Sequence, residues 1–117
     1  MEELKIEVSD GTAGVKIFRL EGPLTLGTMF TFQDRARSEA GPAMLIDLSG
    51  VPYMDSAGLG AVLGVLASCQ RHKRGFAIAG VNERIGTLFQ VAKVDRMLPL
   101  FDSVASAESQ LSKSAGA

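Results

Sequence analysis

An aspartate and a serine, Asp55 and Ser56, stand directly before an apolar run that contains three glycines. Apolar residues before the pair predict a strand, and the spacing of Leu59, Val62 and Leu66 predicts a helix after it. Side-chain oxygens at such a position accept hydrogen bonds from the first, unpaired backbone amides of a helix. Helix capping alone therefore accounts for the pair, and a role in chemistry needs a further signal.

Two enzymatic interpretations of this segment fail on spacing. A serine nucleophile needs a general base within about 3 Å, and the only histidine, His72, follows Ser56 by sixteen residues, roughly 24 Å along one helix. The sequence MDSAG also lacks the glycine that precedes serine in GxSxG. A phosphate-binding loop would need lysine and Ser or Thr after its glycines. We therefore expect no enzyme, no catalytic residue, no cofactor and no metal site.

The glycines after Ser56 carry more information. Gly60 and Gly64 each cost a helix about 1 kcal/mol relative to alanine. Together with Ser56 and Ser68 they fall at every fourth position, which predicts a helix face with only small side chains. Such a face either lies close to another element of the same molecule or docks a partner, and the sequence leaves both alternatives open.

The surrounding elements alternate between strands and helices after an initial hairpin. Strands are predicted over 4–8 and 15–20, paired across a turn at 9–11, over 43–48 and 76–80, and within 97–101. Helices are predicted from Thr25 to about Ala40, over 57–72, after a cap at Asn82, and after a cap at Asp102 or Ser103. This order predicts an α/β sandwich with a mixed sheet of four to five strands and about four helices. We expect one domain, 1–112, and a disordered tail, 113–117.

Composition and charge restrict the possible partners. The formal net charge of −1 over 117 residues lacks the positive surplus needed to bind a nucleic-acid backbone. No segment approaches the ~20 apolar residues needed to cross a bilayer, and the start MEELKIEV does not resemble a signal peptide. The single cysteine, Cys69, cannot form an intramolecular disulfide, which is typical of a reducing compartment. We expect a cytoplasmic protein that binds proteins or small molecules, without nucleic-acid binding or direct membrane insertion.

A basic run, Arg71-His72-Lys73-Arg74, ends the predicted helix just before Gly75. The helix dipole favours cations in the last turn, and glycine is a common residue just past a helix end. We interpret the run as helix termination rather than as a nucleic-acid site.

The segment LIDLSGVPYMDSAGLGAVLG, residues 45–64, resembles the signature of STAS domains of the anti-sigma factor antagonist (anti-anti-sigma factor) type. The likeness includes the apolar strand with Asp47, the proline-containing connection, the Asp55-Ser56 pair and the sequence Gly58-Leu59-Gly60. The predicted elements from about residue 4 to residue 111 also follow the order of that family. The resemblance therefore implies a STAS-like sandwich for nearly the whole chain.

The resemblance also implies partner switching. The unmodified protein would bind an anti-sigma factor that is also a serine kinase, and the sigma factor would be freed. The kinase would phosphorylate Ser56, and a metal-dependent serine phosphatase would restore it. A phosphate adds about −1.5 to −2 charges at the positive end of a helix, which would change the interface and keep the fold. The residues expected to contact the partner are Thr25, Met54, Asp55, Ser56, Gly58, Leu59, Gly60 and Gly64.

The chain departs from the pattern at one position. Kinase-regulated members often carry aspartate in a GxLD stretch after the second strand, whereas this chain has Thr25, which could cap the following helix. Leu59 could also belong to the core, and Phe30 could be exposed for a partner or buried. The alternative functions are a STAS subunit of an ABC-type lipid transport complex, a signalling scaffold and a nucleotide-binding sensor.

Overall fold

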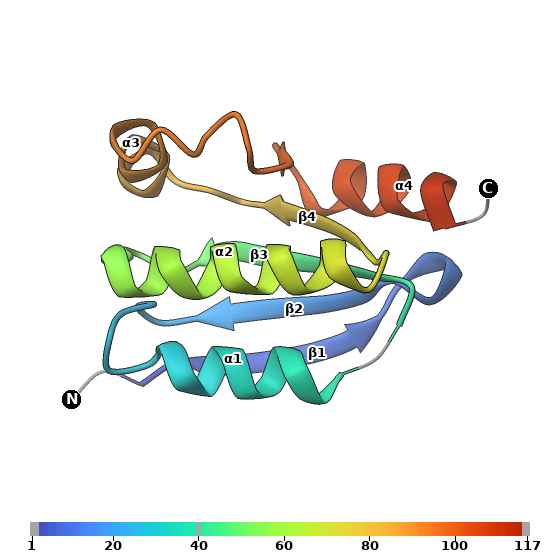
Figure 1. Ribbon diagram of the computed structural model, residues 1–117, viewed down its shortest axis with the longest axis horizontal. Helices are drawn as coiled ribbons and strands as arrows, with labels where there is room; N and C mark the ends of the chain where they lie inside the picture. Colours follow the sequence, from blue (N-terminus) through green and yellow to red (C-terminus); the bar gives the residue numbers. More distant parts are fainter. Residues whose placement is uncertain (1–2, 40, 116–117) are drawn as a thin grey trace.

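The computed structural model describes residues 3–39 and 41–115 as a five-stranded mixed sheet with helices on both faces (Figure 1). The strands are β1 (Lys5–Asp10), β2 (Lys16–Glu21), β3 (Ala43–Gly50), β4 (Gly75–Ala79) and β5 (Leu100–Phe101). The helices are α1 (Met29–Ser38), α2 (Ser56–Arg71), α3 (Glu83–Val91) and α4 (Val104–Ala115), with a short 3-10 helix, η1 (Thr12–Gly14). The predicted fold class is confirmed.

The strands lie in chain order across the sheet, β1-β2-β3-β4-β5. The strands β1 and β2 pair antiparallel, with Val8 opposite Phe18, and the remaining pairs are parallel. The hairpin turn lies later than predicted, because β1 continues to Asp10 and the chain reverses through η1. The Gly11 amide closes this turn on the Val15 carbonyl at 2.7 Å.

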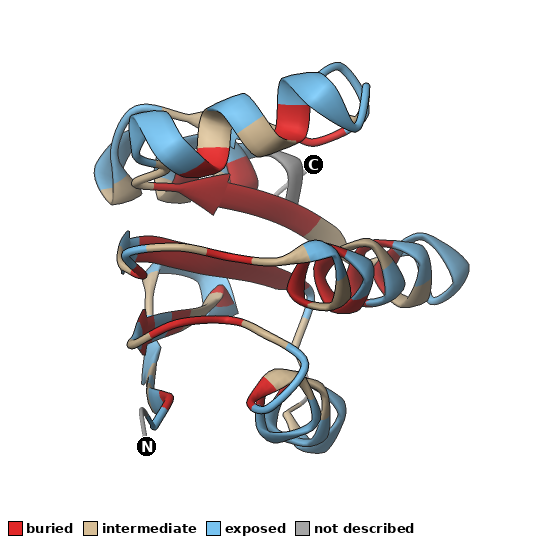
Figure 2. Ribbon diagram, turned by 90° about the vertical axis from the view of Figure 1, so that its left-hand side faces the viewer, coloured by how far each residue is buried: buried red, intermediate tan, exposed pale blue. Residues whose placement is uncertain are grey.

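The central strand β3 separates two apolar cores. All six residues from Ala43 to Leu48 are buried, as expected for a parallel strand covered on both faces. A larger core joins one face of the sheet to α1, α2 and α3, and a smaller core joins the other face to α4. Figure 2 shows the buried residues in the central strands and on the helix faces turned toward them. The sheet therefore holds α1 and α2 together on one face, where their first turns lie at the same end (Figure 1).

The helix α1 begins four residues later than predicted, at Met29 instead of Thr25. The Thr28 hydroxyl accepts a hydrogen bond from the Thr25 amide at 2.9 Å and donates one to the Pro23 carbonyl at 2.8 Å. These bonds hold 23–28 as a loop, because a threonine side chain can satisfy backbone groups that a helix turn would otherwise bond. The predicted end of this helix, Ala40, lies outside the described residues.

The caps of α3 and α4 follow the predictions. The Asn82 side chain accepts a hydrogen bond from the Ile85 amide at 2.8 Å. At α4 the structure selects Ser103 from the two candidates, because its hydroxyl accepts from the Ser106 amide at 3.1 Å. The helix α4 continues to Ala115, into the segment predicted as a disordered tail, while 116–117 lie outside the described residues.

The end of α2 differs from the expected glycine cap. Lys73 takes the left-handed conformation, with φ of 57°, and the Arg74 amide bonds back to the Cys69 carbonyl at 2.8 Å. Gly75 is the first residue of β4.

None of the helices in residues 3–39 and 41–115 has the length and apolar character that crossing a membrane requires.

Candidate functional site

Asp55 and Ser56 divide two tasks at the start of α2. Asp55 is the N-cap, and its Oδ1 accepts a hydrogen bond from the Gly58 amide at 2.9 Å. Ser56 is the first residue of the helix and is exposed. The capping role that the sequence assigned to the pair therefore belongs to the aspartate, which leaves the serine at the surface.

The same aspartate fastens the loop 23–28 to the start of α2. Its Oδ2 accepts a hydrogen bond from the Leu26 amide at 3.1 Å. Two backbone bonds reinforce this contact, from the Leu24 amide to the Tyr53 carbonyl at 3.2 Å and from the Asp55 amide to the Leu24 carbonyl at 3.3 Å. The loop and the first turn of α2 thus form one continuous surface beside Ser56.

Gly58 makes this close approach possible. A β-carbon at Gly58 would overlap the carbonyl oxygen of Leu24, far inside any real contact distance. Gly58 is buried, so the prediction that it contacts a partner is wrong. Its glycine serves packing inside the molecule, between α2 and the loop.

Two further residues predicted at the partner surface lie in the core. Met54 is 8% exposed and Leu59 is 6% exposed, and both belong to the larger apolar core. The surface position predicted for Met54 is wrong, because residues 53–55 run beside the loop and turn Met54 inward at its pairing with Leu24. For Leu59 the core alternative is correct.

Thr25 is half-buried, and its carbonyl oxygen accepts the amides of Thr28 and Met29 at 3.0 and 2.8 Å. The predicted side-chain cap at Thr25 is wrong, because the helix begins beyond it.

Gly60 and Gly64 behave differently from Gly58. Both are exposed, and a β-carbon added at either would find no atom within 4 Å among the described residues. Close packing within the molecule, one of the two alternatives left open by the sequence, therefore does not explain these two glycines. They leave the face of α2 that runs from Ser56 toward Ser68 without large side chains.

Two exposed apolar side chains come from the loop that is bonded to the start of α2 and from the helix turn that follows this loop. Leu26, in the loop, is 66% exposed, and Phe30, in the first turn of α1, is 64% exposed. We call Leu26, Phe30, Asp55, Ser56 and Gly60 the serine surface. The sequence left Phe30 open between core and surface. It gave no signal for Leu26, which lies outside any periodic element, and only its position next to turn residues could have suggested exposure.

Comparison with known proteins shows the family of the chain. Residues 4–107 match the family model of the STAS domain. The chain belongs to the STAS domain family. A stretch of 55 residues, 47% of this STAS domain, is 40% identical to the anti-sigma-B factor antagonist of Staphylococcus epidermidis and covers 51% of that protein. The alignment thus spans about half the length of this relative.

Two solved structures share the fold of this STAS domain. The anti-sigma factor antagonist from Mycobacterium paratuberculosis has a TM-score of 0.83 at 20% identity, over 92% of this chain and 93% of that one. The phosphorylated form of the Bacillus cell fate determinant SpoIIAA has a TM-score of 0.71 at 15% identity, over 91% and 98%. At these identities the likeness shows the fold alone.

The two ends of α2 carry Ser56 and His72, the two residues that hydrolase chemistry would need side by side. Ser56 opens the helix and His72 is its C-cap, with Nδ1 of the ring 2.9 Å from the Ser68 carbonyl oxygen. The histidine of this STAS domain is therefore remote from the serine, as its spacing predicted. Within 3–39 and 41–115 no cluster of three or more His, Cys, Asp or Glu side chains could hold a metal ion.

Proposed function

We propose that this STAS domain is an anti-sigma factor antagonist that acts by partner switching. In the unmodified state the serine surface binds an anti-sigma factor with serine-kinase activity. Phosphorylation of Ser56 releases that partner, and a metal-dependent serine phosphatase reverses the change. The observation that carries the proposal is the exposed Ser56 at the first position of α2, directly after an aspartate that is bonded to the loop carrying the exposed Leu26.

The apolar residues of the serine surface support docking. Leu26 and Phe30 expose most of their area, Leu26 on a loop that Asp55 holds in place and Phe30 in the first turn of α1. Little conformational freedom of the backbone is therefore lost when a partner covers them. Gly60, one turn into α2, presents no side chain, which lets the partner approach the helix backbone. The names of the Staphylococcus relatives support an anti-sigma factor as that partner.

Phosphorylation would change this surface without unfolding the domain. The Ser56 oxygen would attack the γ-phosphorus of ATP, forming an O–P bond as ADP leaves and the hydroxyl proton passes to the kinase. The product adds about −1.5 to −2 charges at the first turn of α2, where the helix dipole stabilises an anion. Together with the Asp55 carboxylate it would repel an apolar or acidic partner surface. The Bacillus cell fate determinant, whose phosphorylated form has been solved, shares this fold.

Intact-mass measurement tests the proposal. The protein and its Ser56→Ala variant are each incubated with a purified anti-sigma factor kinase and ATP. We expect one phosphate on the unmodified protein and none on the variant. Because Ser103 is also exposed and stands just before a helix, Ser103→Ala is the matched control and should gain one phosphate. No mass gain, or equal gain by Ser56→Ala, contradicts the proposal.

A further inference from the structure

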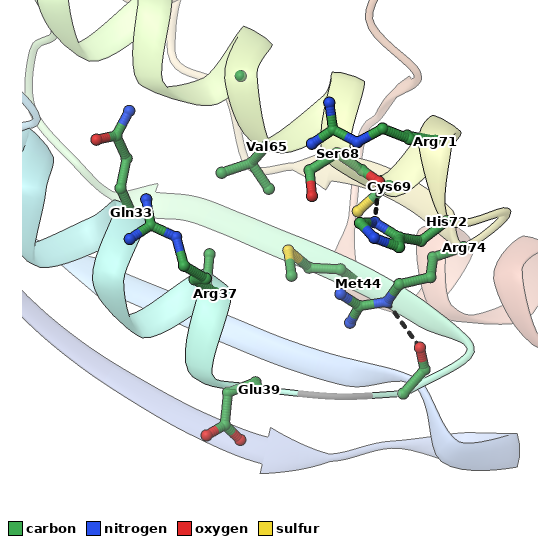
Figure 3. Close-up of a pocket in the computed structure, with 13 residues that line it drawn as sticks. Gln33, Arg37, Glu39, Met44, Val65, Ser68, Cys69, Arg71, His72 and Arg74 are labelled. Atoms are coloured by element: carbon green, nitrogen blue, oxygen red, sulfur yellow. Dashed lines mark hydrogen bonds between the residues drawn. The ribbon is translucent and has the colours of Figure 1, made fainter.

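A cavity of about 570 Å³ lies between α1 and the C-terminal half of α2, away from Ser56 (Figure 3). The basic run that ends α2 supplies part of its wall, through Arg71, His72 and Arg74. Arg37 lines it from α1. Its volume falls within the range typical of small-molecule sites, about 300–1,000 Å³. The basic run therefore has a possible use beyond ending a helix.

Among the described residues, one hydrogen bond holds the side chain of Arg74 in this cavity. Its Nε donates to the Gly41 carbonyl oxygen at 2.7 Å, which fixes the plane of the guanidinium (Figure 3). Its Nη2 is buried and has no hydrogen-bond partner among the described residues. Buried donors on charged groups are rarely left unpaired, because their desolvation is then uncompensated. A hydrogen-bond acceptor bound in the cavity would give Nη2 of Arg74 the partner that it lacks.

The other charges of the cavity favour an anion. Arg71 reaches over the cavity from α2 (Figure 3). Arg37 makes only a long, exposed ion pair, 3.7 Å from Nη1 to Asp34 Oδ1, so its charge is weakly compensated. Glu39 also lines the cavity, but its carboxylate points away from Arg71 and Arg74 (Figure 3). Arginines suit phosphate because their planar donors can bind two oxygens at once.

The remaining wall is aliphatic. Ala36, Met44, Val65 and Cys69 line it, and among the described residues that line the cavity the imidazole of His72 is the one ring. The His72 ring lies at the end of α2, where its Nδ1 is 2.9 Å from the Ser68 carbonyl oxygen, whereas a short aliphatic chain would contact the four aliphatic and sulfur-containing side chains. Gly64 lines the cavity too, and a side chain there would meet no atom of the protein within 4 Å.

We propose that this cavity binds a soluble phosphate monoester with a short aliphatic chain. The phosphate oxygens accept hydrogen bonds from Arg74 Nη2 and from Arg71, and the chain lies against Met44 and Val65. The site lies at the opposite end of α2 from Ser56, so it is independent of the proposed partner switching.

Calorimetric titration with n-hexyl phosphate tests this site. We expect saturable binding to one site, weakened about tenfold or more with hexanoate, which lacks the phosphate, and with inorganic phosphate, which lacks the chain. Absence of saturable binding of n-hexyl phosphate overturns the proposal. Equal binding of hexanoate overturns the assignment of phosphate.

Two matched glycine variants locate the ligand. Gly64→Leu fills the cavity, and we expect it to abolish binding. Gly60→Leu introduces the same side chain one turn earlier on α2, also into open space but outside the cavity, and should bind n-hexyl phosphate normally. Both replace an exposed helical glycine, so neither should unfold the domain. Normal binding by Gly64→Leu overturns the proposal.

The arginines provide a second check. Arg71 is exposed, and Arg71→Gln should weaken binding of n-hexyl phosphate about tenfold. Arg35 is also an exposed arginine, on α1 and outside the cavity, and Arg35→Gln should leave binding unchanged.

Sedimentation with vesicles of phosphatidylcholine and phosphatidic acid distinguishes a membrane lipid from a soluble ligand. We expect the protein not to sediment with the vesicles. If it sediments and Gly64→Leu abolishes this, the ligand is a membrane lipid and the proposal of a soluble ligand is overturned.

Discussion

Asp55 accepts a hydrogen bond from the backbone amide of Leu26, 3.1 Å from its Oδ2, across 29 residues of sequence. Its second oxygen caps α2 through the Gly58 amide at 2.9 Å. One carboxylate thus fixes both the helix start and the loop that carries an exposed leucine. The neighbouring serine takes no part in this scaffold, so it can be modified while the scaffold stays in place.

The double role of Asp55 predicts a loss of stability when it is replaced. We expect Asp55→Ala to lower the free energy of unfolding by about 1–2 kcal/mol, because a helix cap disappears together with the bond to Leu26. Urea unfolding followed by circular dichroism measures this. Asp102→Ala is the control, since Ser103 caps α4 instead, and its midpoint should not change. A midpoint for Asp55→Ala equal to that of the unmodified protein would contradict the capping role.

The glycines of α2 predict substitution effects of opposite sign. Gly58→Ala places a β-carbon on the Leu24 carbonyl and should destabilise the domain by about 1–3 kcal/mol, as overpacking does. Gly60→Ala and Gly64→Ala enter open space and should stabilise it by up to about 1 kcal/mol, because alanine favours a helix. Thermal unfolding of the three variants checks the contrast. The same sign at all three positions would refute it.

These glycines also show how far the sequence predicts the site. The spacing of small residues in the sequence correctly predicted a face of α2 without large side chains. The capping residues correctly located the start of the helix. It could not separate Gly58 from Gly60, because their difference depends on where the Leu24 carbonyl lies, and that contact joins residues distant in sequence. Met54 was misplaced for the same reason, since its pairing with Leu24 turns it inward.

The strands were predicted better than the loop between β2 and α1. Unbroken apolar runs such as 43–48 specify buried strands directly. The start of α1 was wrong because the Thr28 side chain bonds the Thr25 amide and the Pro23 carbonyl. A helical pattern of apolar residues does not reveal such a local alternative, and the exposure of Leu26 follows from it.

A negative charge at Ser56 should weaken partner binding and leave stability intact. Ser56→Glu places one charge at the first helical position, where the dipole stabilises an anion by about 0.3–1 kcal/mol. We expect an unfolding midpoint at or above that of Ser56→Ala, and a lower affinity for the anti-sigma factor by calorimetry. If Ser56→Glu binds as tightly as Ser56→Ala, charge at this position does not control docking.

The exposed apolar residues of the serine surface should contribute affinity without contributing stability. We expect Leu26→Ser and Phe30→Ser each to raise the Kd for the anti-sigma factor about tenfold, as loss of a buried anchor does. Val91→Ser removes an equally exposed apolar side chain, 74% exposed, from α3 and serves as the control. A loss of affinity in Val91→Ser as large as in Phe30→Ser would show that docking is not confined to this surface.

The raised pKa of Cys69 predicts that its thiol reacts slowly in the folded protein. Burial raises the pKa of the Cys69 thiol, and the nearby Arg74 guanidinium lowers it by a smaller amount. The folded protein therefore keeps the proton to higher pH than the unfolded chain, so this contribution to stability is intact below the ordinary thiol pKa and is lost as pH rises through the folded pKa. We expect slow reaction with a thiol reagent at pH 8 and fast reaction in urea. Equal rates in both conditions would contradict the burial.

Because each strand pairs with the one before it in the chain, every pairing surface exists by the time the next strand is synthesised. A nascent chain emerges from its N-terminus, so β2 can fold back on β1 at once, and β3, β4 and β5 can each be added in turn. No later strand has to insert between two strands that are already paired. Synthesis and sheet assembly can therefore run in the same direction.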